Sequence, residues 1–294
     1  MGSLAYDDVE TPFESRRDVL GGAASYFALA ASHYAPVRMV GVIGEDFRQA
    51  DLDRFARRPI DLAGVEHAAG RSFRWLGRYD YGLNAAETLN TDLGVFRAWQ
   101  PRIPEPFRDS DLVFLANIDP EIQLRTLEQV RSPKVVVLDT MNYWIEHSRE
   151  ALERVIGRVH IVSINEAEAR QLAQEHSVFR AARRVLALGP RAVIVKRAEY
   201  GALLLTRERA FWTPAYPLEE VRDPTGAGDA FAGGVLGYLA GCASVDDRAL
   251  RRAMLHGTAC ASFSVEDFSV DGIEAITPAR LEERVRELQA LAVP

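Results

Sequence analysis

Cysteine is scarce in this sequence of 294 residues, which holds only Cys242 and Cys260. Their spacing fits neither a metal site nor a disulfide-rich framework, so we expect two reduced core residues. No apolar run is long enough to span a membrane, and the N-terminus has no basic segment followed by an apolar one. These absences predict a cytoplasmic protein with no membrane partner.

Runs of basic residues are also absent, and 42 acidic residues against 35 basic ones give a formal net charge of -7. Such a balance disfavours a nucleic-acid partner. One stretch, residues 71–99, interleaves arginines with aromatic residues and could stack on single-stranded nucleic acid, but the net acidity makes that a minor alternative. Any phosphate group must therefore be bound by local features of the chain.

A G-x-G-x-x-G fingerprint after the first predicted strand is missing, which argues against a dinucleotide-binding oxidoreductase. Internal repeats, low-complexity tracts and linkers are missing as well. A chain of this length with 48% hydrophobic residues can bury a large core. We therefore expect a single domain over residues 1–294.

What the sequence does contain is a loop of small residues that opens a helix. Gly226, Ala227 and Gly228 precede Asp229, and an apolar run follows over residues 230–239. A helix start presents unpaired N–H groups and the positive end of the macrodipole, so it can hold an anion such as phosphate. Asp229 could then take a proton from an attacking hydroxyl as a general base. Taken alone, it could equally be an ordinary carboxylate at a helix N-terminus.

Four short apolar runs in the middle of the chain each end at a polar residue, which is typical of parallel strands buried on both faces in an α/β fold. Ligands bind at the carboxyl ends of such strands, so the polar residues are candidates for one site. Any one of them could also merely end its strand. The runs are 112–116, 135–138, 160–164 and 192–195, followed by Asn117, Asp139, Asn165 and Lys196.

The stretch 223–231, Asp-Pro-Thr-Gly-Ala-Gly-Asp-Ala-Phe, is followed by Gly233-Gly234 and resembles the C-terminal signature of the ribokinase family, the phosphofructokinase-B type of carbohydrate kinase. Nine ordered positions agree, which is far more specific than a bare G-x-G-D. The Gly21-Gly22 turn, which runs into a helix of small residues, resembles the family's N-terminal signature. The resemblance covers nearly the whole chain in the family's order.

This resemblance implies a ribokinase-like three-layer αβα sandwich, with a mainly parallel central sheet and a small β-lid formed by about residues 9–19 and 71–99. It implies an ATP-dependent kinase that phosphorylates a hydroxyl of a small sugar or sugar-like polyol. Asp229 would be the general base, and the amides of Gly226, Ala227 and Gly228 would form an anion hole. A homodimer through the lid is compatible with it.

The resemblance also implies which residues bind the acceptor. Relatives open with an apolar strand that ends in Gly-Ser and leads to a sugar-binding Asp; Gly2, Ser3 and Asp7 match the end of that pattern, and the strand itself is missing. Gly21 and Gly22 would bring their backbone amides close to the sugar.

Tyr26 is a departure from the family pattern, because ribokinases proper carry an asparagine at this position. A phenol cannot copy the two-way hydrogen bonding of an amide. A different sugar, a polyol such as an inositol, or a nucleoside is therefore an alternative acceptor. Tyr26 could equally be a core aromatic with a satisfied hydroxyl. Asn117, at a predicted strand end, is a further candidate for acceptor binding.

Asn165 and Glu168 match the family's Asn-x-x-Glu motif, which organises Mg²⁺ and its waters around the phosphates of ATP. The alternative for this pair is a helix N-cap with a first-turn acid. The remaining cofactor candidates by resemblance are Lys196, Thr225, Gly226 and Gly228 for the nucleotide and Asp223 for K⁺.

Two rival functions remain open. A nucleoside kinase of the same fold could stack a base on lid aromatics such as Phe73 and Trp75. A non-catalytic sugar-binding regulator derived from a kinase would be expected to lose the catalytic acid, and Asp229 is present.

Overall fold

The computed structural model describes residues 1–291, which form two compact units. Unit 1 consists of Met1 and residues 101–214, and unit 2 consists of residues 2–100 with the described residues from 215 onward. Each unit has its own hydrophobic core. The expectation of one catalytic domain over residues 1–294 stays a prediction.

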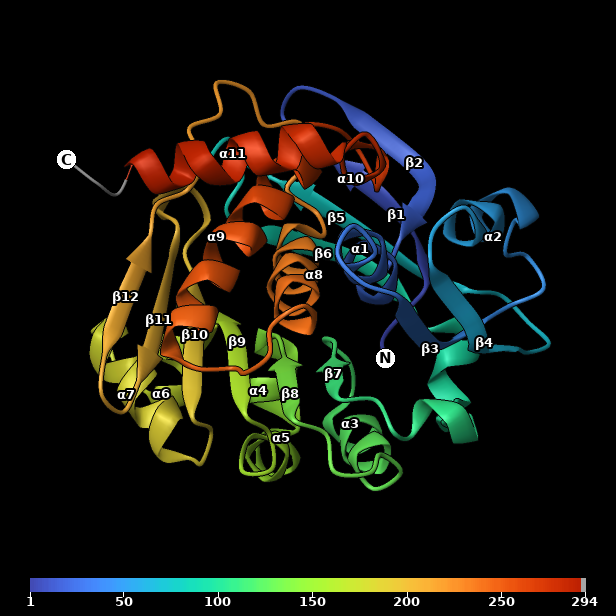
Figure 1. The fold of residues 1–294 in the computed structure, drawn as a ribbon. Coiled ribbons are helices and arrows are strands. Elements are labelled where there is room, and N and C mark those ends of the chain that lie inside the picture. Colours follow the sequence, from blue (N-terminus) through green and yellow to red (C-terminus); the bar gives the residue numbers. More distant parts are fainter. Residues whose placement is uncertain (292–294) are drawn as a thin grey trace. The chain divides into compact units, whose positions relative to one another are not determined.

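Unit 1 is built on a six-stranded sheet, whose strands lie side by side in the order β12-β11-β10-β9-β8-β7 (Figure 1). Strands β7 to β10 are parallel, whereas β11 and β12 are antiparallel to their neighbours. The mainly parallel sheet is confirmed, and the four predicted strands are correct to within one residue at each end. The strands are β7 Leu112–Leu115, β8 Val135–Asp139, β9 Ile161–Asn165, β10 Ala192–Lys196, β11 Ala202–Thr206 and β12 Ala210–Thr213.

The helices of unit 1 present one apolar face each, as amphipathic crossovers should. In α7, Ala181, Val185 and Leu186 are buried, and Ser177 caps the first turn by accepting a hydrogen bond from the Arg180 amide. The described helices of this unit are α3 Pro120–Leu127, α4 Asn142–His147, α5 Arg149–Ile156, α6 Glu166–Ala173 and α7 Val178–Ala187, with 3-10 turns η2 Glu105–Phe107 and η3 Ala198–Tyr200.

Unit 2 contains a four-stranded sheet in the order β2-β1-β5-β6, and a parallel pair, β3 Val37–Ile43 with β4 Ile60–His67. The four strands are β1 Ala5–Glu10, β2 Ser15–Gly21, β5 Phe73–Tyr79 and β6 Ala86–Asp92. These strands include much of residues 9–19 and 71–99, which the sequence assigned to a β-lid, and their action as a lid stays a prediction. The first strand already begins at Ala5, so Asp7 lies inside it, and Gly94–Ala98 is the 3-10 turn η1.

Helix α8 packs between α1 and α9 in unit 2 (Figure 1). Glycines make this packing close: a Cβ on Gly233 would lie 2.5 Å from the Phe27 carbonyl oxygen in α1, and one on Gly234 would lie 2.6 Å from the His256 carbonyl oxygen in α9. The helices of this unit are α1 Ala23–Ala31, α2 Gln49–Ala56, α8 Ala227–Ala240, α9 Asp247–Ser264, α10 Asp271–Glu274 and α11 Pro278–Leu291.

Among the residues that the structure describes, no helix combines the length and the apolar character needed to cross a membrane.

Substitution of Gly233 by alanine tests the contact between α8 and α1. The new methyl group must push α1 away, which costs about 1–3 kcal/mol and exceeds the gain of about 1 kcal/mol from replacing a glycine inside a helix. We expect Gly233→Ala to lower Tm by roughly 2–6 °C in a thermal melt. The control is Gly241→Ala at the end of the same helix, where the nearest atom would be 3.7 Å away. An equal Tm loss in both variants would contradict the packing argument.

Candidate active site

The loop before α8 turns sharply at Gly226, whose φ of +74° lies in the left-handed region that glycine tolerates. A Cβ at this position would lie 2.3 Å from the Tyr26 ring, so no side chain fits. The helix then begins at Ala227, and Asp229 stands in its first turn. The predicted small-residue loop and its acid are thus found at a helix start, where negative charge is stabilised.

The buried side chain of Asp223 holds this loop in place through hydrogen bonds. Its side chain is 1% exposed, and its two carboxylate oxygens accept hydrogen bonds from the Thr225 amide at 2.9 Å and the Ser269 amide at 3.2 Å. Burial raises the pKa of Asp223, although these hydrogen bonds oppose the shift. The structure therefore gives Asp223 a role in holding the loop, whereas its assignment to K⁺ stays a prediction.

Tyr79 also holds the loop, and the sequence analysis did not single it out. It ends β5, it is nearly buried, and its hydroxyl lies 3.1 Å from the Thr225 hydroxyl. The four-stranded sheet is thereby tied to the residue that precedes Gly226. The alternation of aromatic residues in β5 was visible in the sequence, but which loop Tyr79 reaches was not.

Asp7 lies inside β1 and is 4% exposed. Its carboxylate covers Gly21, where a Cβ would lie 1.9 Å from the Asp7 Oδ2, and the Gly22 amide donates a hydrogen bond to it. Burial, reinforced by the carboxylates of Asp223 and Asp229, raises the pKa of Asp7 to about 8. Unit 2 thus brings Asp7 near two acids, Asp223 and Asp229, that follow it by more than 200 residues in the sequence.

Helix α1 starts at the glycine pair and is capped by Ser3. The Ser3 hydroxyl accepts from the Ala23 amide at 3.1 Å, and its carbonyl oxygen accepts from the Ala24 amide at 2.9 Å. Gly22, with φ +89°, leaves no room for a Cβ because the Ser3 carbonyl oxygen would lie 2.5 Å from it. Gly2-Ser3 and Gly21-Gly22 therefore meet at one turn.

Tyr26 lies in α1 with only 1% of its side chain exposed. Its burial is that of a core aromatic, but its hydroxyl has no hydrogen-bond partner among the described residues, and its part in acceptor binding stays a prediction. The condition attached to the core alternative, a satisfied hydroxyl, is not met.

In unit 1, Asn165 and Glu168 form a capping box at the start of α6. The Asn165 side chain accepts from the Glu168 amide at 2.8 Å, and the Glu168 carboxylate accepts from the Asn165 amide at 3.0 Å. The capping role that the sequence offered as an alternative is therefore real. Burial raises the pKa of Glu168 to about 7, opposed by the Lys196 ammonium and assisted by the Asp139 carboxylate.

Lys196 ends β10 and makes a buried ion pair with Asp139 at the end of β8, with 2.5 Å between Nζ and Oδ2. Asn117 accepts a hydrogen bond from the Trp144 indole at 3.1 Å. The polar strand ends of unit 1 therefore do gather at one edge of its sheet. Within residues 1–291, no three acidic, histidine or cysteine side chains are grouped closely enough to hold a metal by themselves.

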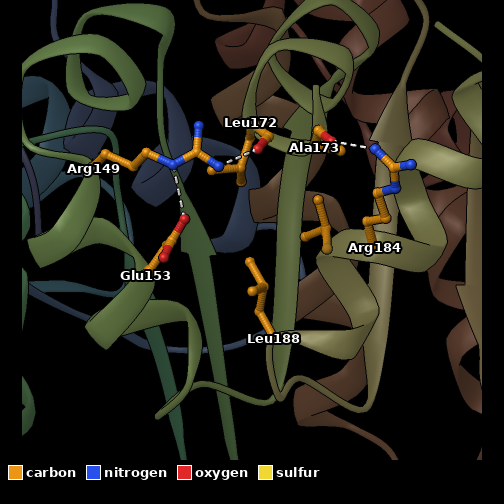
Figure 2. A pocket seen from close by; sticks show the side chains of 7 residues that line it. Arg149, Glu153, Leu172, Ala173, Arg184 and Leu188 are labelled. Carbon is orange, nitrogen blue, oxygen red and sulfur yellow. Dashed lines mark hydrogen bonds and ion pairs between the residues drawn. The ribbon is translucent and has the colours of Figure 1, made fainter. Parts of the chain in front are cut away.

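A cavity of about 200 Å³ also lies in unit 1, at the end of α6 opposite Asn165 (Figure 2). Its two arginines are already engaged: Arg149 donates to Glu153 and to the Leu172 carbonyl, and Arg184 donates to the Ala173 carbonyl. These contacts hold the α6 terminus against α5 and α7, and we assign the cavity no part in the site.

Unit 2 holds a helix start of small residues with an acid in its first turn, and unit 1 holds a mainly parallel sheet with polar residues at its strand ends. Each feature is typical of α/β proteins that bind phosphate groups. The comparisons with known proteins agree. The family description "pfkB family carbohydrate kinase" matches residues 3–275. The chain therefore belongs to this family and is a kinase that uses a hydroxyl group as acceptor.

A cytidine kinase from Thermococcus kodakarensis is 32% identical over 249 residues, which is 82% of this chain and 88% of that protein. Burkholderia thailandensis nucleoside kinase in complex with inosine matches with a TM-score of 0.78 and 22% identity, over 97% of this chain and 96% of that one. Methanocaldococcus jannaschii nucleoside kinase, described as an archaeal member of the ribokinase family, matches with a TM-score of 0.76, 21% identity and coverage of 97% and 96%. The ribokinase-like fold is confirmed.

The raised pKa of Asp7 predicts a pH dependence of stability. The folded chain keeps the Asp7 proton up to about pH 8, whereas an unfolded aspartate releases it near 3.8, so stability falls as pH rises between these values. In Asp7→Asn this loss is absent. We expect the drop in Tm from pH 5 to pH 8 to be smaller by roughly 5 °C than in the wild type. The control is Asp8→Asn at the less buried neighbour, which should show the same drop in Tm with pH as the wild type. An unchanged drop in Asp7→Asn would contradict the raised pKa of Asp7.

Proposed function

We propose that the protein is an ATP-dependent kinase that transfers the terminal phosphoryl group of ATP to a hydroxyl of a small sugar or sugar-like polyol. The observation that carries the proposal is the start of α8, where Gly226 takes a left-handed turn that admits no side chain and Asp229 follows in the first turn. Asp7 lies near enough for the Asp229 charge to act on it. An acid and an anion cradle in one unit suit in-line phosphoryl transfer.

Each residue of unit 2 has a distinct task in this mechanism. Asp229 takes the proton from the acceptor hydroxyl as that oxygen attacks phosphorus. The amides of Gly226, Ala227 and Gly228 stabilise the charge that develops on the transferring group. Binding and orientation of the acceptor fall to Asp7, Gly21, Gly22 and Tyr26, with Asn117 as a further candidate from unit 1.

Residues of unit 1 have the chemistry needed to bind Mg²⁺ and the nucleotide. Asp139 and Glu168 supply buried carboxylate oxygens, which are the hard ligands that Mg²⁺ prefers, and Asn165 adds an amide. Asn165 and Glu168 would hold Mg²⁺ through water, and the ion would neutralise the phosphate charge when bound. The nucleotide would be contacted by Lys196, Thr225, Gly226 and Gly228. Asp223 would be a ligand of K⁺. A homodimer through the four-stranded sheet and a cytoplasmic location belong to the same proposal.

A nucleoside is the second candidate acceptor, and one observation favours it. The 32% identical relative that spans most of the chain is a cytidine kinase. In unit 2, Trp75 is partly buried in β5 and packs near Tyr79 and Val9, so an aromatic surface is present in the four-stranded sheet. A non-catalytic sugar-binding regulator is disfavoured because Asp229 is present in the expected first turn.

The proposal predicts ADP release from MgATP with at least one acceptor in a panel of cytidine, inosine, ribose, fructose and myo-inositol. Asp229→Asn should lower kcat by roughly 10²–10⁴-fold, because a general base contributes about that much, while thermal stability and ATP binding stay near wild-type. The control is Asp246→Asn, which changes the N-cap of α9 to a residue that caps equally well. Activity near wild-type in Asp229→Asn would rule out its role as the base.

Glu168 makes the response to Mg²⁺ dependent on pH. Because its pKa is about 7, the carboxylate is largely protonated at pH 6 and ionised at pH 8, so the Mg²⁺ concentration for half-maximal activity should be roughly tenfold higher at pH 6. Glu168→Gln keeps the capping box but removes the charge, so a high Mg²⁺ requirement is expected at both pH values. Glu166→Gln is the control, since Arg170 and Arg197 already neutralise Glu166. An unchanged titration in Glu168→Gln would remove Glu168 from the metal site.

A further inference from the structure

The hairpin formed by β1 and β2 in unit 2 changes register in its middle. The pairs next to the turn follow one register, and the pairs farther from it follow another, shifted by one residue of β2. Between the two parts, β2 contributes Arg17 and Asp18 where β1 contributes only Asp8. Such an extra residue is a β-bulge, which bends its strand and increases the local twist. The pairs are Glu10–Ser15 and Val9–Arg16 on the turn side, and Asp7–Val19, Tyr6–Leu20 and Ala5–Gly21 on the other side.

The turn of this hairpin holds the first register by its own hydrogen bonds. The Thr11 amide donates to the Glu14 carbonyl oxygen at 2.9 Å, and the Glu14 amide donates to the Thr11 hydroxyl at 3.1 Å. Without the extra residue, this register would continue along β1 and place Asp18 directly opposite Asp7. Like charges directly opposite each other destabilise a sheet. The bulge therefore decides which part of β2 lies beside Asp7.

The shifted register is the one that brings Asp7 to the glycine pair. The Asp7 carboxylate covers Gly21, where a Cβ would lie 1.9 Å from Oδ2, and it accepts a hydrogen bond from the Gly22 amide. Gly21 is the last residue of β2, so the residues before it set its position along β1. Without the shift, Leu20 would take the place of Gly21, and its side chain would collide with the Asp7 carboxylate.

Asp18 has the backbone conformation and the contacts that keep the bulge in place. Its φ of +54° lies in the left-handed region, where aspartate and asparagine are found more often than other residues with a side chain. Its amide donates to Asp8 Oδ1 at 2.7 Å, which closes the bulge across the hairpin. Its carboxylate accepts from Arg74 at 2.5 Å and from Arg48 at 3.2 Å. These two contacts tie the bulge to β5 and to the start of α2.

We propose that the bulge at Asp18 positions the site for the phosphoryl acceptor, because it sets the register that holds Asp7 against Gly21 and Gly22. The inference rests on the proposed function, which assigns acceptor binding to these three residues, and it adds Asp18 as a positioning residue that acts through the backbone. The conformation of Asp18 matters more than its charge. Its side chain is half exposed, and ion pairs of exposed groups contribute little.

Substitutions of Asp18 separate its backbone conformation from its charge. Asp18→Val introduces a β-branched residue, which strongly disfavours a positive φ, so the bulge should rearrange. We expect the Kd of the best acceptor in the panel, measured by calorimetry, to rise roughly tenfold or more, while the KM for ATP changes by less than about twofold. Asp18→Asn and Asp18→Gly remove the charge but accept the left-handed conformation, so the acceptor Kd should stay within about threefold of the wild type.

The matched control is Ser132→Val, because Ser132 is an exposed residue of unit 1 with a φ of +45°. It should lower Tm as Asp18→Val does and leave the acceptor Kd unchanged. An unchanged acceptor Kd in Asp18→Val would mean that the bulge only stabilises the hairpin, which would overturn the inference. An equal rise in Asp18→Gly and Asp18→Val would assign the effect to the carboxylate and would overturn it as well.

A second readout needs no turnover and separates this inference from the proposed function. Because the register sets the burial of Asp7, Asp18→Val should also reduce the drop in Tm between about pH 5 and pH 8, as Asp7→Asn does. If the wild type releases ADP with no compound of the panel, the proposed function fails, and this drop in Tm alone decides whether the bulge positions Asp7. If the wild type is active, the acceptor Kd decides it.

Discussion

The start of α8 depends on one steric constraint, the absence of any side chain at Gly226. Only a glycine can take the left-handed turn there while its Cα presses on the Tyr26 ring. Helix α8 begins directly after this turn, and Asp229 stands in its first turn. Asp223 fixes the loop from within through two backbone amides. Helix α8 is itself fixed by close contact with its neighbours, since a Cβ on Gly233 would lie 2.5 Å from the Phe27 carbonyl oxygen in α1.

The sequence predicted the sheet of unit 1 well because its strands are buried on both faces. A continuous apolar run that stops at a polar residue is a strong pattern, and the structure moves each end by at most one residue, since the terminal Asp139 or Lys196 still pairs within its strand. The four-stranded sheet was harder to delimit. Strand β2 exposes its first four residues and β6 nearly all of its residues, so neither shows a clear alternation. Strand β4 was not predicted for a similar reason, since buried residues are few in it.

The part of the candidate site that one short sequence motif forms was predictable. The contacts between segments that are distant in the sequence were not. Gly226 to Asp229 form a local motif, so their position at a helix start follows from sequence. The partners that hold this motif cannot be predicted in the same way, because they are distant in the sequence. Ser269 follows its partner Asp223 by 46 residues, and Tyr79 precedes its partner Thr225 by 146 residues. The same holds for the ion pair of Asp139 with Lys196. For Asn165 and Glu168, sequence offered capping or metal binding; the structure shows capping, and the two roles are compatible because capping uses one carboxylate oxygen.

Three ionised carboxylates near the start of α8 would oppose the proposed phosphoryl transfer, since each negative charge repels the incoming phosphate. Burial resolves this conflict in unit 2. Like charges in a poorly solvated place cannot all ionise, and the rise in the pKa of Asp7 to about 8 means that this carboxyl is mostly protonated at neutral pH. The backbone amides that hold Asp223 partly offset its charge. Asp229 differs from both, because it stands in the first turn of a long helix, where the macrodipole favours the anion. The surroundings of these three chemically identical groups thus differ, and Asp229, the proposed base, is the one at the helix start.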